Sequence, residues 1–367
     1  MVRTRVLIVD DAVVIRRLLH NILSVDPALE VVGSASGGKI ALARIPQLNP
    51  DVIILDVEMA EMDGLQTLTE IRKIYPSLPV IMFSAHTAKG AAATIDALLL
   101  GATDYVTKPS NTNNLDGAIE SVRENLLPKI KQFQPLIKVS STEKAEPGIL
   151  FPENKPPKRK SCRIDVVTIG VSTGGPNALA VVLPKLLRDF PVPLLIVQHM
   201  PPLFTRTLAE RLDHLCDIQV KEANGGEFLK PGCAWLAPGG FHLVLEKMPE
   251  GVKLKLNLDP PENFCRPAVD VTFRSAAEIY QGQCLGVVMT GMGRDGLRGS
   301  EMIYERGGQV VVQDKESSVV WSMPQAVVNA GLADQIVKLE ELGDEIVNRV
   351  KKSRLSGAVP FGITHES

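Results

Sequence analysis

The sequence IDVVTIGVSTGGP, residues 164–176, decides the fold of the second half of the chain. Its apolar first part predicts a buried strand, and the glycines after it let the backbone turn sharply into a helix whose first turn accommodates Pro176. Ser172 lies on this turn, where a substrate can approach closely and the N–H groups at the start of the helix can stabilise an oxyanion. The segment therefore predicts a nucleophilic serine, with a serine that only caps the helix as the alternative from local sequence.

Two further apolar strands end in the side chains that a serine nucleophile requires. His199 follows the strand at 194–198, and Asp295 lies in the glycine-rich turn after the strand at 285–289. Because parallel strands end at one edge of a sheet, we expect Ser172, His199 and Asp295 to converge there. His199 would accept the serine proton, and Asp295 would hold the imidazole in the required tautomer. The chain order of serine, histidine and acid differs from that of α/β-hydrolases, which excludes that fold.

The turn that carries Asp295 also fits a dinucleotide-binding fingerprint. Gly291, Gly293 and Gly296 match the pattern G-x-G-x-x-G, and Asp314 follows a later strand. In dinucleotide-binding proteins the helix N-terminus receives a pyrophosphate, and Asp295 would place a carboxylate against that anion. Dinucleotide binding is therefore the weaker interpretation.

The middle of the second half alternates apolar and polar residues. From about residue 220 to residue 257 the chain is also broken by glycine and proline pairs, which predicts antiparallel strands and hairpins that form an appendage. Residues 266–270 then lead into a helix that we expect to end at Tyr280. The second half is therefore predicted to be an α/β domain with a mainly parallel sheet.

The first third of the chain repeats a strand followed by a helix five times. This repeat predicts a five-stranded, doubly wound parallel sheet with ligands beyond the carboxyl ends of its strands. The polar side chains at that edge are Asp10, Asp11, Asp56, Ser84 and Lys108. Three close carboxylates repel one another unless a cation is present, and oxygen ligands suit Mg²⁺. We therefore expect phosphoryl transfer to Asp56, with Lys108 and Ser84 holding the anionic group.

With Met62-Asp63-Gly64 and Lys108-Pro109, these residues resemble the flavodoxin-like receiver domains of two-component response regulators. The resemblance implies phosphorylation at Asp56 in the presence of Mg²⁺. The implied metal-binding residues are Asp10, Asp11, Asp56 and Glu58, and the implied switch residues are Ser84, Tyr105 and Lys108. Ala60 stands where the family usually has proline, and a cis peptide bond is expected between Lys108 and Pro109.

The second half resembles the catalytic domain of chemotaxis protein-glutamate methylesterases, the CheB family. The matching segments are GVSTGGP at 170–176, QHMP at 198–201, RPAVD at 266–270 and TGMGRDG at 290–296. The resemblance implies hydrolysis of glutamate methyl esters by Ser172, His199 and Asp295, activated by phosphorylation and accompanied by deamidation of particular glutamines. It further implies that Thr173 assists near the nucleophile and that the N–H of Met292 binds the oxyanion. Arg294 occupies a position often held by a small residue.

The implied partners are methyl-accepting chemoreceptors as substrates and a chemotaxis histidine kinase as phosphodonor. Ester hydrolysis itself needs no cofactor in this family. The competing class is a response regulator with a DNA-binding output, but the second half shows no compact basic recognition helix. We therefore expect no nucleic-acid partner.

Composition limits the possible environments of the protein. The 40 basic and 42 acidic side chains give a net charge of −2, which offers no general reason for a polyanionic partner. Five cysteines occur without a C-x-x-C pair, so neither a zinc cluster nor a disulfide framework is predicted. Since no apolar run approaches the roughly 18 residues of a membrane span, we expect a cytoplasmic protein without membrane insertion.

The length of 367 residues suggests two domains. Between Pro128 and Ser161 the apolar periodicity disappears and prolines mix with charged residues, as is typical of a linker. The predicted division is a receiver domain at 1–127, a linker at 128–162, a methylesterase domain at 163–350 and a tail at 351–367.

Overall fold

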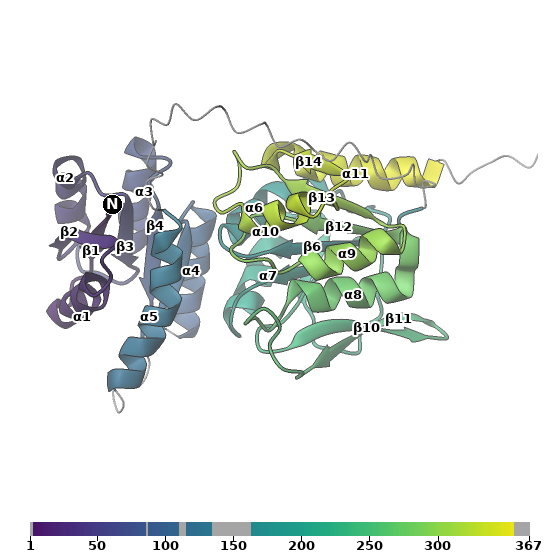
Figure 1. The fold of residues 1–367 in the computed structure, drawn as a ribbon, viewed down its shortest axis with the longest axis horizontal. Helices are drawn as coiled ribbons and strands as arrows, with labels where there is room; N and C mark the ends of the chain where they lie inside the picture. Colours follow the sequence, from purple (N-terminus) through teal and green to yellow (C-terminus); the bar gives the residue numbers. More distant parts are fainter. Residues whose placement is uncertain (1–2, 86, 110–114, 134–162, 356–367) are drawn as a thin grey trace, which may run out of the picture. The chain divides into compact units, whose positions relative to one another are not determined.

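The computed structural model describes residues 3–85, 87–109, 115–133 and 163–355, which form two compact units divided at residue 148 (Figure 1). Residues 134–162 of the predicted linker and residues 356–367 of the predicted tail lie outside the described residues. Within the described part, no helix combines the length and the apolar character of a membrane span.

The N-terminal unit contains the predicted five-stranded parallel sheet. Its strand order is β2-β1-β3-β4-β5, and every neighbouring pair is parallel. The strands are β1 (Thr4–Val9), β2 (Leu29–Ala35), β3 (Val52–Asp56), β4 (Val80–Ser84) and β5 (Asp104–Thr107). The central strands β1, β3 and β4 are almost entirely buried, as expected for strands covered on both faces, whereas the edge strand β2 is mostly only partly buried.

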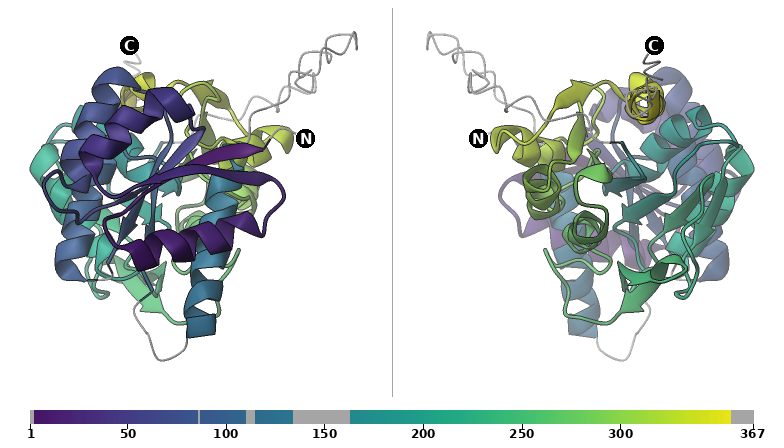
Figure 2. Two further views of the ribbon diagram at one scale, coloured as in Figure 1. Left: turned by 90° about the vertical axis from the view of Figure 1, so that its left-hand side faces the viewer. Right: turned by 90° about the vertical axis from the view of Figure 1, so that its right-hand side faces the viewer.

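Helices cover both faces of this sheet (Figure 2). Helix α1 packs beside α5 over one face, while α3 packs between α2 and α4 over the other. The helices are α1 (Val13–Ser24), α2 (Gly38–Leu48), α3 (Gly64–Ile74), α4 (Ala88–Leu99) and α5 (Leu115–Lys131). Helix α5 continues through Pro128, past the predicted domain end at residue 127.

The C-terminal unit is built on a seven-stranded sheet with the order β14-β13-β12-β6-β7-β9-β8, in which all pairs are parallel. The strands are β6 (Val166–Val171), β7 (Leu194–Gln198), β8 (Gln219–Glu222), β9 (Cys233–Leu236), β12 (Cys284–Val288), β13 (Gln309–Gln313) and β14 (Gln335–Val337). An antiparallel pair, β10 (His242–Met248) and β11 (Gly251–Asn257), stands apart from this sheet. The predicted mainly parallel sheet with an antiparallel appendage is confirmed.

The extent of the appendage was predicted wrongly. Strands β8 and β9 belong to the parallel sheet, so only β10 and β11 form a hairpin. Strand β8 lies at the edge of the sheet and is partly exposed, which gives it the alternating pattern of a hairpin strand. The alternating pattern of apolar and polar residues in β8 therefore reflects the exposure of one face of the strand and does not indicate whether the strand pairs in the parallel or the antiparallel direction.

Helices also form two layers around the seven-stranded sheet. Helix α6 contacts α7 and α11 in one layer, and α9 contacts α8 and α10 in the other. The helices are α6 (Gly175–Val182), α7 (Phe204–Leu215), α8 (Val269–Tyr280), α9 (Leu297–Glu305), α10 (Ser322–Asn329) and α11 (Leu339–Leu355), with short 3₁₀ turns η1 (Leu183–Lys185) and η2 (Gln281–Gln283). Helix α8 ends at Tyr280, as predicted, whereas α11 continues past residue 350.

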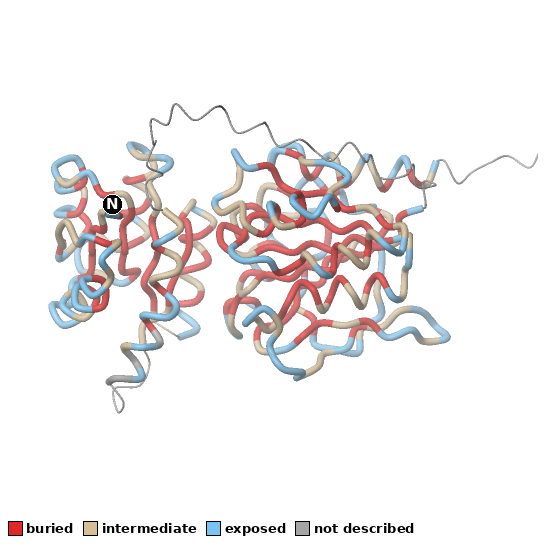
Figure 3. Tube along the Cα trace, viewed as in Figure 1, coloured by how far each residue is buried: buried red, intermediate tan, exposed pale blue. Residues whose placement is uncertain are grey.

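The central strands position the candidate site. Figure 3 shows that the buried chain follows the strands of each unit, and every residue of β6 and β12 is buried. From β6 the chain passes to β7 on one side, and it later returns to β12 on the other. Ligands of such sheets bind beyond the carboxyl ends of the strands at this change of direction. Ser172, His199 and Asp295 follow β6, β7 and β12 at that edge.

Candidate functional site

The turn after β6 holds Ser172 by its backbone. The Ser172 N–H donates to the carbonyl of Thr290 at 3.0 Å, and the Ser172 carbonyl accepts from Gly175 N at 2.8 Å and Gln198 Nε2 at 3.0 Å. Gly174 adopts the left-handed conformation, with φ 78°. A Cβ at Gly175 would collide with Gln198 Oε1, so the close packing here requires glycine. Ser172 is thus fixed between the two neighbouring strand exits, and its side chain is half-buried.

His199 and Asp295 form a direct hydrogen bond. Nε2 of His199 lies 2.7 Å from Oδ2 of Asp295, and both side chains are largely buried. The His199 N–H donates to the carbonyl of Val171 at 3.3 Å, which ties the histidine backbone to the strand that carries Ser172. Burial lowers the pKa of His199, but the hydrogen bond and charge of Asp295 act together with Cys265 to outweigh burial and raise that pKa.

The carboxylate of Asp295 is surrounded by donors. Oδ1 accepts from Asn263 Nδ2 at 2.8 Å, Asp270 N at 2.9 Å and Gly296 N at 3.0 Å, while Oδ2 also accepts from Val269 N at 2.6 Å. Two of these N–H groups open helix α8, where the helix dipole favours an anion. Burial would raise the pKa of Asp295, but its hydrogen bonds, above all the one with His199, lower it. Asp295 is therefore a carboxylate held ionised against the imidazole.

Thr173 lies directly after the candidate nucleophile and is 6% exposed. Its carbonyl accepts a hydrogen bond from Thr290 Oγ1 at 2.9 Å. The same hydroxyl accepts from Val320 N at 3.1 Å, so Thr290 joins the Ser172 turn to the loop before α10.

Met292 lies on the loop after β12, close to Ser172. A Cβ at Gly291 would come within 2.8 Å of Ser172 Cβ, so glycine allows this loop to approach the serine. The hydroxyl of Ser322 accepts from Gly293 N and donates to the carbonyl of Gly291, both at 3.0 Å. Ser322 therefore fixes the peptide groups on both sides of Met292.

The acidic residues of the N-terminal unit also meet. Ligand oxygens of Asp10, Asp11 and Asp56 all lie within 4.8 Å of one another. Nζ of Lys108 lies 2.7 Å from Asp56 Oδ1 and 3.1 Å from Asp10 Oδ2. Burial raises the pKa of Asp56 to about 6, assisted by the charge of Asp10 and opposed by Lys108. Keeping the buried carboxylates of Asp10 and Asp56 close to each other and to the exposed Asp11 is costly without a second cation.

The donor set fits a hard divalent cation such as Mg²⁺. Carboxylate oxygens are its preferred ligands, and apart from the ion pair with Lys108 the buried Oδ2 of Asp10 has no hydrogen-bond partner among the described residues. Glu58 is exposed, and its N–H donates to Asp56 Oδ1 at 3.3 Å, which brings the Glu58 backbone to the same edge. The N-terminal unit thus carries an acidic cluster typical of a Mg²⁺ site.

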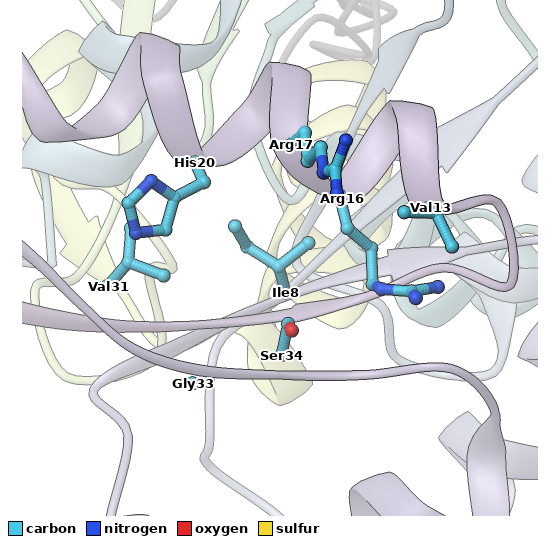
Figure 4. A pocket seen from close by; sticks show the side chains of 8 residues that line it. All are labelled: Ile8, Val13, Arg16, Arg17, His20, Val31, Gly33 and Ser34. Atoms are coloured by element: carbon cyan, nitrogen blue, oxygen red, sulfur yellow. The ribbon is translucent and has the colours of Figure 1, made fainter.

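A pocket of about 340 Å³ lies between α1 and the strands β1 and β2 (Figure 4). Arg16 in its wall donates from Nη1 to the carbonyls of Asp10 and Asp11, at 2.7 and 2.9 Å. The pocket wall therefore fixes the backbone of two of the acidic residues.

The predicted switch residues Ser84 and Tyr105 are both buried. The Ser84 hydroxyl is buried and donates to the carbonyl of Gly90 in α4 at 3.1 Å, so it points to the helix and not to Asp56. Tyr105 is buried, and Nζ of Lys129 lies 5.1 Å from the centre of its ring. Burial raises the pKa of Tyr105 well above its ordinary value, so the phenol stays neutral.

The prediction of a cis peptide bond between Lys108 and Pro109 is wrong. Among the described residues the cis peptide bond is the one between Arg266 and Pro267. The trans form is favoured by about 0.5–1 kcal/mol for a residue before proline, and sequence alone does not show the contacts that reverse this preference.

Two family models match the chain. The model of the CheB methylesterase covers residues 167–346, and the model of the response regulator receiver domain covers residues 6–120. A protein-glutamate methylesterase/protein-glutamine glutaminase of Trichodesmium erythraeum is 54% identical over 352 residues, which span 95% of this chain and 100% of that protein. The chain belongs to the CheB methylesterase family. The predicted N-terminal receiver domain is confirmed. The predicted assignment as a protein-glutamate methylesterase and protein-glutamine glutaminase is also confirmed.

Two further proteins of the CheB family match the whole chain or its C-terminal unit. A Bacillus subtilis protein of the same name is 42% identical over 363 residues, or 96% of this chain and 99% of that protein. The crystal structure of the Thermotoga maritima CheB methylesterase catalytic domain matches with a TM-score of 0.50 and 43% identity, over 50% of this chain and 98% of that domain.

Some residues that shape this CheB site were not predicted from sequence. Asn263 lies between two motifs and contacts Asp295 only because the chain folds back across 32 positions. Ser322 is 31 positions from the Gly291 carbonyl that it binds. Gln198 was noted only as part of the QHMP segment, although its amide holds the Ser172 carbonyl. No local pattern distinguishes these residues from ordinary polar residues of loops.

Proposed function

We propose that this chain hydrolyses glutamate methyl esters of methyl-accepting chemoreceptors through Ser172, His199 and Asp295. The hydrogen bond between His199 and Asp295, at the strand exits beside the Ser172 turn, carries this proposal. Because Nε2 of His199 faces Asp295, Nδ1 is the atom that accepts the serine proton. Oγ of Ser172 then bonds to the ester carbonyl carbon, and the carbonyl oxygen becomes an oxyanion.

The N–H of Met292 and the N–H groups at the start of α6, beside Thr173, would stabilise that oxyanion; the close approach of the Gly291 backbone to Ser172 supports this role. The bond to the methoxy group breaks, and methanol leaves with the proton from His199. Water, deprotonated by His199, hydrolyses the glutamyl ester of Ser172 and frees the glutamate carboxylate and the serine. With a receptor glutamine the leaving group is ammonia, and the product is again glutamate. None of these steps needs a cofactor.

Phosphorylation of Asp56 by a chemotaxis histidine kinase regulates this reaction in our proposal. Asp10, Asp11 and Asp56 would hold Mg²⁺ together with the backbone carbonyl of Glu58, and the ion would neutralise the transferred phosphoryl group. Lys108 is already placed to pair with a phosphoryl group on Asp56. Ser84 and Tyr105 would respond to that group as switch residues. We assign the receiver to 1–127, the linker to 128–162, the methylesterase domain to 163–350 and the tail to 351–367, in a cytoplasmic protein.

Methanol release from methylated receptor membranes tests both parts of the proposal. Ser172→Ala should abolish release while Asp56 still accepts phosphate, because the nucleophile is lost and the N-terminal unit is unchanged. Asp56→Asn should retain basal release but lose the increase that a phosphodonor produces. Ser24→Ala, an exposed serine of α1, is the matched control. Undiminished release by Ser172→Ala would refute the assignment of the nucleophile.

A further inference from the structure

A tight turn at Glu262–Cys265 lies beside Asp295. The N–H of Glu262 donates to the Cys265 carbonyl at 3.1 Å, and the N–H of Cys265 donates to the Glu262 carbonyl at 2.9 Å. The two central residues, Asn263 and Phe264, have φ values of 53° and 63°. Both lie in the left-handed region, as in a type I′ turn, where asparagine is well tolerated and phenylalanine is not. The bidentate ion pair of Glu262 with Arg274, at 2.6 Å for both contacts, anchors the turn.

The turn directs the amide of Asn263 between two buried carboxylates. Nδ2 donates to Asp295 Oδ1 at 2.8 Å and to Asp270 Oδ2 at 2.9 Å. An amide nitrogen carries two hydrogens, so both are used for these two acids. Asp270 is 1% exposed and Asp295 is 2% exposed, which leaves water little access to the pair.

The two carboxylates depend on Asn263 to different degrees. Asp295 accepts four further hydrogen bonds, from three backbone N–H groups and from His199. Asp270 accepts one other among the described residues, from Gly299 N at 2.7 Å. Burial and the charge of Asp295 raise the pKa of Asp270 to about 6, and the bonds from Gly299 and Asn263 oppose that rise. Asp270 is therefore the acid that gains a proton first when a donor is lost.

We propose that Asn263 is a positioning residue for the reaction. Its amide keeps Asp270 and Asp295 both ionised and apart, so that the full charge of Asp295 faces His199. The inference rests on the roles proposed above for His199 and Asp295. Asn263 acts through Asp295 and needs no contact with the substrate.

Loss of the Asn263 amide should lower the pKa of His199. Two buried carboxylates without a shared donor take up a proton between them, because like charges at close range disfavour double ionisation. A proton shared with Asp270 reduces the negative charge that Asp295 presents to His199. The imidazolium of His199 is then less stabilised, so the pKa of His199 falls.

Other charged or titratable groups also face this cluster. The groups whose charges act on His199, Asp270, Asp295 or their ion-pair partners are Cys265, Glu262, Arg274, His242 and Arg298. None of them is changed in the variants below, so the comparison with the unaltered protein isolates the amide.

Asn263→Gly in the full-length protein is the direct test, because glycine accepts the left-handed backbone and removes only the side chain. NMR titration of ¹⁵N-labelled histidine, with His199 assigned through His199→Gln, measures the pKa without requiring activity. We expect the His199 midpoint to fall by about half a pH unit or more. The acid limb of kcat/KM for methyl ester hydrolysis should move the same way, with kcat/KM lowered roughly tenfold at its optimum.

Two matched variants separate positioning from loosening of the loop. Phe264→Gly changes the adjacent residue of the same turn and should leave the His199 midpoint in place. In an Asp270→Asn background, Asn263→Gly should add no further shift, because no second carboxylate is left to share a proton. An unmoved midpoint in Asn263→Gly overturns the proposal, as does a full shift in the Asp270→Asn background. If the unaltered protein lacks esterase activity, the proposed function fails while the NMR titration still decides the role of Asn263.

Discussion

The five hydrogen bonds to Asp295 explain how a buried acid can stay ionised and stabilise the imidazolium of His199. Three come from backbone N–H groups, which no side-chain substitution removes, and two of these open helix α8. A carboxylate with so many donors stays ionised even when buried. Its charge raises the pKa of His199, so the neutral imidazole that accepts a proton appears only at higher pH. Activity should therefore rise with pH through a midpoint above the ordinary histidine value of about 6.5.

Asp295→Asn tests this electrostatic role. An amide carries no charge to stabilise the imidazolium, so the pKa of His199 should fall and the acid limb of kcat/KM should move to lower pH. The rate at the optimum should drop by roughly 10⁴-fold, because the imidazole is no longer held in the productive tautomer. A pH series of methanol release measures both effects. An acid limb that stays in place would show that Asp295 does not set the pKa of His199.

The strands and helices could be predicted from sequence where the spacing of apolar residues and the positions of glycine and proline indicate them. Strand exits with Ser172, His199 and Asp295 were predicted to meet because parallel strands share one carboxyl edge. Pairing direction was misjudged for β8 because an exposed edge strand alternates in either direction. It was misjudged for β9, which is fully buried, because the proline and glycine residues on both sides of it resemble hairpin turns. Asn263 was missed because its contacts depend on the conformation of the turn. The left-handed φ values of Asn263 and Phe264 cannot be predicted from these two residue types.

The Glu262–Cys265 turn gives a prediction about stability. Phe264 is fully exposed, at 103%, and has φ 63°. The left-handed backbone costs an L-residue about 1–2 kcal/mol, whereas glycine carries an entropic cost of about 0.5–1 kcal/mol. Phe264→Gly should therefore increase the free energy of unfolding of the C-terminal unit by about 0.5–1 kcal/mol. Denaturant unfolding measures the change.

Phe228→Gly is the control for that prediction. Phe228 is 36% exposed and is absent from the residues with positive φ in the described chain, so glycine there relieves no backbone strain and brings its entropic cost together with the loss of the packing of the ring. It should lower the free energy of unfolding. Equal effects of the two substitutions would show that the backbone conformation of Phe264 stores no strain.

The molecule divides its chemistry between two units that each have a sheet and a buried core of their own. The acidic cluster and Lys108 lie entirely in the N-terminal unit. Ser172, His199, Asp295 and the residues that hold them lie entirely in the C-terminal unit. In our proposal, phosphorylation of Asp56 in the N-terminal unit thus regulates an active site in the C-terminal unit. The N-terminal unit contributes no catalytic side chain to that site.

Truncation to residues 163–367 tests this division. Because the C-terminal unit holds every group of the proposed ester chemistry, the fragment should release methanol from methylated receptors. It should show no response to a phosphodonor, since Asp56 is absent, whereas the full-length protein should respond and its Asp56→Asn variant should not. Far-ultraviolet circular dichroism would establish that the fragment is folded before its rate is compared. A folded fragment without activity would mean that the N-terminal unit completes the active site, and a fragment that still responds to the phosphodonor would place the regulated residue outside the receiver.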